Sequence, residues 1–64
     1  MNKFIKLNII DKDDTIIVEY VNVNHILKIY MCEYNVCVEL INHEILKLKD
    51  ENLDVFMDRF YFSK

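Results

Sequence analysis

Residues 36–50 have the sequence VCVELINHEILKLKD, and this stretch decides the fold class. Apolar side chains fall at every second position over residues 36–41, which is typical of a β-strand with one buried face. The pair Asn42-His43 follows at the position of a hairpin loop, where Asn is well suited, and residues 44–49 return as a second strand. The period changes at Asp50. The stretch therefore predicts a β-hairpin that leads directly into a helix.

Three further strands are predicted before this hairpin, over residues 4–10, 15–21 and 26–32. The first alternates between apolar and polar side chains, with one apolar face. The second is apolar and β-branched almost throughout, which predicts a strand buried on much of both faces. After a short turn at 22–25, the third is expected to direct three side chains into the core: Leu27, Ile29 and Met31.

The C-terminal segment has helical periodicity. Four apolar residues are spaced i, i+3, i+4 and i+7, and they form one stripe on a helix: Leu53, Phe56, Met57 and Phe60. We expect the helix over about residues 51–61, with Asp50 as its N-cap.

These elements predict an α+β fold, a small antiparallel β-meander or half-open barrel of about five strands with one C-terminal helix. The 64 residues form a single domain, 1–64. A chain of this length buries only about 60% of its unfolded surface, so its stability is marginal. An open sheet also has two edges that invite strand addition by another copy. The sequence therefore predicts a homo-oligomer.

Composition narrows the possible partners. The net charge is −3, with eight Lys and Arg scattered along the chain, and this disfavours nucleic acid as a partner. No apolar run approaches the roughly 20 residues of a membrane helix, so no membrane insertion is expected. Two cysteines without a secretion signal fit a cytoplasmic protein.

The sequence MCEYNVC at residues 31–37 holds both cysteines. If residues 33–36 form a four-residue loop, Cys32 and Cys37 face each other across a strand pair, and free, bridged and metal-bound states all remain open. Zinc could use these two thiols with His25 and His43, but the spacing matches no short zinc knuckle. We expect no metal site and packed, free thiols.

No pattern in the sequence predicts catalysis. The one Ser and the one Thr, Ser63 and Thr15, are not in a nucleophile setting. The acidic residues over 11–14 lack the central glycine and the spacing of a calcium-binding loop. We expect a non-enzymatic protein with no catalytic residues and no cofactor.

Aromatic residues gather at the C-terminus in greater number than one helix face needs. Part of this group is expected to pack on the sheet, and the remainder to form a contact surface, because clustered exposed aromatics mark interfaces. The predicted interaction residues are Phe56, Phe60, Tyr61 and Phe62.

The sequence VNVNHILKI at residues 21–29, followed by VCVELINHEILKLKD, resembles the small flagellar FlbD/SwrD-like proteins. The matching positions are Asn22 (or Asn24 with a shifted register), Ile26, Ile29, Val36, Val38, Leu40 and Asn42, and Asp50 stands where that family's helix begins. His43 replaces the glycine of the family's hairpin. The resemblance implies a small interaction or structural protein without catalytic residues.

A second resemblance involves residues 25–40 and 45–60, which are similar to part of the LytTR-type DNA-binding domain. Its matching positions are Tyr34, Val36, Leu53 and Phe60. This resemblance implies a nucleic-acid-binding or transcription-associated domain, which the net charge places second to self-association.

Overall fold

The computed structural model describes residues 3–64. It contains five strands and one C-terminal α-helix, so the α+β class predicted from the sequence is confirmed. Each strand begins and ends within one residue of the predicted bounds. The elements are β1 (Phe4–Ile10), β2 (Ile16–Asn22), the 3-10 helix η1 (Val23–His25), β3 (Ile26–Cys32), β4 (Asn35–Leu40), β5 (Ile45–Leu48) and α1 (Leu53–Phe62).

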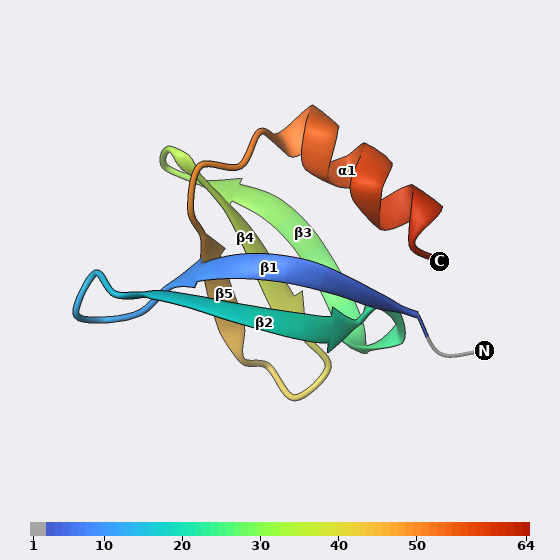
Figure 1. Cartoon of the computed structure of the whole chain (residues 1–64), viewed down its shortest axis with the longest axis horizontal. Helices are drawn as coiled ribbons and strands as arrows, with labels where there is room; N and C mark the ends of the chain where they lie inside the picture. The colour runs from blue at the N-terminus through green and yellow to red at the C-terminus, as the bar shows by residue number, and fades with distance from the viewer. Residues whose placement is uncertain (1–2) are drawn as a thin grey trace.

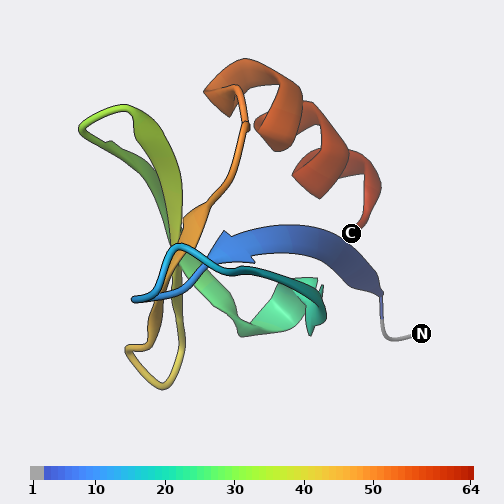
Figure 2. The same cartoon turned by 60° about the vertical axis from the view of Figure 1, so that its left-hand side comes forward.

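The strands form one open antiparallel sheet in the order β2-β1-β5-β4-β3. An uninterrupted meander is wrong, because that order would pair β2 with β3. Instead η1 turns the chain away from the first hairpin, with the Asn22 side chain accepting a hydrogen bond from the Asn24 N–H at 2.9 Å. Figures 1 and 2 show the β1–β2 hairpin crossing the other three strands at a large angle. In the strand order given above, β2 and β3 are the two edges of the sheet.

The core lies on the sheet face beneath α1 (Figure 1). Alternating side chains of β1, β4 and β5 point to this face, as the period-2 pattern predicts. Phe56 of α1 is fully buried against them. The buried residues are Ile5, Leu7, Ile9, Val21, Val23, Val36, Val38, Leu46, Leu48 and Phe56.

The side chains of β3 that meet the core differ from those predicted. Its register shifts between Ile26 and Lys28, which is an irregularity of the β-bulge type. The shift leaves Leu27 exposed, while Ile26 and Ile29 pack against the core. Met31 is also exposed. The expectation that Leu27, Ile29 and Met31 form one buried face is therefore wrong at Leu27 and Met31.

Helix α1 begins at Leu53, two residues after the predicted start. The Asn52 side chain caps it by accepting a hydrogen bond from the Val55 N–H at 3.1 Å. Asp50 is not the cap, because its backbone has a φ of 53° and lies outside the helix. Phe56 occupies the middle of the apolar stripe, and the stripe ends are only partly buried.

Turns without glycine place other residues at positive φ. These residues are Asp14, Glu33, His43 and Asp50. Asp and His tolerate the left-handed region better than most residues, whereas Glu has no such preference. Glu33 is the first of two residues that join β3 to β4, a position at which two-residue hairpins favour Asn, Asp or Gly.

Replacing Glu33 by Gly should therefore stabilise the fold. We expect Glu33→Gly to raise the free energy of unfolding by about 0.5–1 kcal/mol, since Gly adopts positive φ without a steric penalty. Urea unfolding followed by circular dichroism measures the change. Lys12→Gly, in a turn residue whose φ is not positive, should give no gain. A loss of stability in Glu33→Gly would contradict the strain assigned to this turn.

Candidate interaction surface

Strand β2 is an exposed edge, and the prediction that it is buried on much of both faces is wrong. All five residues from Ile16 to Tyr20 are exposed, and Val21 is the strand's buried residue. The reason is its position at the end of the sheet, where β1 covers one side only. Most of the apolar side chains of β2 are therefore exposed to solvent.

The register shows which backbone groups of β2 are free. Asp11 N–H donates to Thr15 O at 3.0 Å, and Val23 N–H donates to Lys3 O at 3.0 Å. Odd-numbered residues of β2 therefore bond to β1, and the even-numbered ones point away from it. No strand within residues 3–64 lies on that side. The N–H and C=O groups of Ile16, Val18 and Tyr20 form an open row along the edge.

The two edges of the sheet differ in how they resist strand addition. Strand β3 has an irregular register and the charged residue Lys28, and both features protect an edge. Strand β2 pairs with β1 in unbroken register, and its single charge is Glu19. Glu19 lies opposite Leu7, on the side of the sheet that bears the core. The other side of β2 carries Ile16, Val18 and Tyr20.

An open groove of about 580 Å³ connects the β2 edge with the end of α1. Tyr20 and Phe4 line it from the sheet, and Phe62 and Val55 line it from the helix. All four side chains are largely exposed. In Figures 1 and 2 the C-terminal end of α1 lies beside the start of β1. The edge and the helix end therefore form one apolar surface.

The four predicted interaction residues divide between core and surface. Phe56 is 0% exposed and belongs to the core, and Phe60 is half-buried against it. Tyr61 and Phe62 are 72% and 82% exposed. Their rings meet edge to face, with centroids 6.1 Å apart and planes at 89°. The exposed residues among the four are therefore Tyr61 and Phe62. The exposed Tyr20 of β2 lines the same groove as Phe62.

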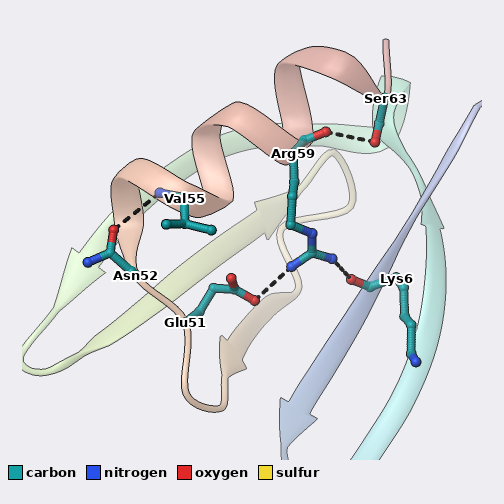
Figure 3. A network of polar contacts seen from close by, with 6 residues as sticks. All are labelled: Lys6, Glu51, Asn52, Val55, Arg59 and Ser63. Atoms are coloured by element: carbon teal, nitrogen blue, oxygen red, sulfur yellow. Dashed lines mark hydrogen bonds and ion pairs between the residues drawn. The ribbon is translucent and has the colours of Figure 1, made fainter.

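Arg59 ties the helix to the sheet (Figure 3). Its Nη1 lies 2.9 Å from Glu51 Oε2, and its Nη2 donates to the backbone carbonyl of Lys6. Strand β5 is too short to pair with β1 at this point, so the guanidinium satisfies a carbonyl that the sheet leaves free. The Ser63 hydroxyl closes the helix by donating to Arg59 O at 2.7 Å. No sequence pattern indicates this role of Arg59, because Lys6 lies 53 residues away along the chain.

The cysteines lie on the sheet face opposite α1. The loop between β3 and β4 has two residues instead of four, so Cys32 lies opposite Asn35, and Cys37 lies opposite Tyr30. The four-residue loop that would have placed the two cysteines opposite each other is therefore not formed. Both thiols are free. Burial raises the pKa of the Cys37 thiol, and the charge of the Cys32 thiolate raises that pKa further. Cys37 is therefore a poor nucleophile in the folded protein.

The histidines have separate surroundings. His43 Nδ1 lies 3.1 Å from Glu39 Oε2 on the surface, and His25 ends η1. Within residues 3–64 no three His, Cys, Asp or Glu side chains are grouped so that they could hold a metal ion.

The chain matches no protein-family model, no curated protein and no solved structure. Over residues 3–64, no helix has both the length and the apolar character that crossing a membrane requires.

Proposed function

We propose that this protein is a small non-enzymatic interaction protein that associates with further copies of itself. The observation that carries the proposal is the open edge of β2, whose exposed residues Ile16–Tyr20 are apolar except for Glu19. Long apolar edges without protection favour strand addition. Pairing with another chain satisfies the free backbone groups and buries apolar surface that one copy of a 64-residue chain leaves in water.

The aromatic helix end supports the same role. Phe62 and Tyr20 border one groove, so a chain that adds to β2 would also reach the end of α1. A FlbD-like form is part of this proposal and rests on the resemblance of residues 21–50. A half-open barrel is also part of this proposal, and the large angle between the β1–β2 hairpin and the other three strands supports it, because such an angle is typical of a strongly coiled sheet. A cytoplasmic location is also proposed, from the two free thiols.

A charge in the middle of the β2 edge tests the proposal. Val18→Lys should shift sedimentation velocity from an associated species to a monomer, and raise the dissociation constant at least about tenfold, because the lysine would be desolvated. Asn8→Lys is the matched control: it lies opposite Val18 on the covered strand β1 and should associate like the wild type. Equal association of Val18→Lys and the wild type would refute the role of the edge.

Charging the helix end separates its contribution from that of the edge. Phe62→Asp should weaken association less than Val18→Lys does, because Phe62 lies at the border of the surface. Association that is lost in Phe62→Asp and kept in Val18→Lys would assign the contact to α1 instead of β2.

Nucleic-acid binding is the second candidate. Three lysines, Lys6, Lys28 and Lys47, lie on the sheet face opposite the core. Tyr20 and Tyr30 lie on the same face. Lys28 Nζ lies 5.1 Å from the centre of the Tyr30 ring. Lysines among exposed aromatics are typical of single-strand binding surfaces. Fluorescence anisotropy with a labelled oligonucleotide at low salt tests this function, and an absence of salt-sensitive binding would remove it.

A further inference from the structure

We infer that two copies pair along β2 in antiparallel register centred on Val18, so that each Val18 lies opposite the Val18 of the second copy. This inference rests on the proposed function and specifies its interface. The product is a continuous sheet of two copies related by a twofold axis, which is a closed arrangement.

The free backbone groups fit this register. Ile16, Val18 and Tyr20 point away from β1, and they are spaced symmetrically about Val18. In the proposed pair, the two Val18 residues exchange both of their backbone hydrogen bonds, and each Ile16 does the same with Tyr20 of the second copy. Every free group in the exposed part of the edge then has a partner.

The side chains fit the same register. On the face opposite the core, each Tyr20 lies opposite an Ile16, and an aromatic paired with a β-branched residue is a favourable cross-strand contact. On the core-bearing face, Glu19 lies opposite Ile17 of the second copy. A register centred on Glu19 would place two carboxylates directly opposite each other, which is unfavourable. Glu19 therefore selects against that alternative.

Charge complementarity at the strand ends supports a second copy as the occupant. An antiparallel arrangement brings the turn Asp11–Asp14, which has three acidic residues and one lysine, toward the far end of β2 in the second copy. The cation Lys3 lies at that end, where Lys3 O accepts the Val23 N–H. The twofold axis repeats this contact. The net charge of −3 on each copy is thus opposed by local attraction at both ends of the interface.

Pairing of β2 with β3 of another copy is less favourable. The irregular register of β3 interrupts the row of backbone groups there, and Lys28 lies at the irregularity. Such a head-to-tail contact would also generate open filaments instead of a closed dimer.

Engineered cysteines test the register in the full chain. Cys32→Ser removes the exposed thiol, and the buried Cys37 is kept. In this background Val18→Cys should form a disulfide-linked dimer on mild oxidation with diamide, because paired strands place the two Cα atoms about 5.5 Å apart. Ile16→Cys alone and Tyr20→Cys alone are the controls. Their thiols would lie four residues from the equivalent thiol, about 13 Å along the strand.

The expected result is dimer formation in Val18→Cys at least about tenfold faster than in either control, together with cross-linking when Ile16→Cys and Tyr20→Cys are mixed. If Val18→Cys fails to fold by circular dichroism, the mixed pair tests the same register by itself. Equal rates in all single variants, in a protein that associates by sedimentation, would overturn the register and leave the proposed function standing. A monomer at every concentration would overturn both.

Discussion

Replacing Phe56 by Ala should remove a large part of the protein's free energy of unfolding at room temperature. The ring is the fully buried side chain of α1, and its removal leaves a cavity between the helix and the sheet. Such substitutions cost about 3–5 kcal/mol. The whole domain has roughly 3–10 kcal/mol of stability by its length, so the loss is comparable to the total. Urea titration monitored by circular dichroism measures it.

Phe62→Ala is the matched control for this experiment. The same residue type is removed from the same helix, but the side chain is mostly in water. Its effect on the free energy of unfolding should stay within about 0.5 kcal/mol. A Phe56→Ala variant whose stability lies within about 1 kcal/mol of the wild type would contradict the assignment of Phe56 to the core.

The second large effect is expected at Arg59. Arg59→Met keeps much of the side-chain volume but removes the contacts to Glu51 and to the Lys6 carbonyl. Because the Glu51 side chain is 11% exposed and would lose its charged partner, we expect a loss of about 1–2 kcal/mol, reduced by the partial exposure of Arg59. Thermal unfolding should show this loss, with increased amide exchange in α1.

Lys49→Met provides the corresponding control at a surface pair. Lys49 Nζ lies 3.9 Å from Asp50 Oδ1, and both side chains are largely exposed. Such pairs contribute little, so the unfolding midpoint should stay close to that of the wild type. Equal losses in Arg59→Met and Lys49→Met would show that Arg59 does not connect the helix to the sheet.

Strict alternation made β1 and β4 predictable. In both strands every second residue is apolar and meets the core, so the pattern specifies the face as well as the element. Cys37 shows the limit of this reasoning. It alternates away from the core and is still buried, because Tyr30 and Lys47 lie on either side of it in the neighbouring strands.

Strand β2 could not be placed by its composition. A strand that is apolar on both faces has the same sequence whether it lies in the middle of a sheet or at an edge that pairs with another chain. The decisive information is the pairing of β1 with β5, which depends on contacts between distant residues. The sequence therefore predicted a contact at a sheet edge and at the aromatic helix end without indicating which strand forms that edge, and the structure shows that β2 and β3 are the two edges.

The remaining differences between prediction and structure arise where neighbouring residues suit the same structural role or where no residue marks an irregularity. Asp50 and Asn52 are both good N-caps, and the structure uses Asn52 because Asp50 is needed at positive φ where the chain leaves β5. The irregularity near Leu27 has no glycine to signal it. The two-residue turn at Glu33 was not predicted for a similar reason, because Glu has no preference for the positive φ that it adopts there.

Residue-resolved amide hydrogen exchange of the wild type at high and low protein concentration tests the central claim most directly. If copies associate through β2, the amides of Ile16, Val18 and Tyr20 should gain protection as concentration rises, while the exposed amides of β3 stay unchanged. Self-association through the β2 edge would be contradicted if these three amides exchanged without protection at every concentration. It would also be contradicted if protection rose at β3 instead.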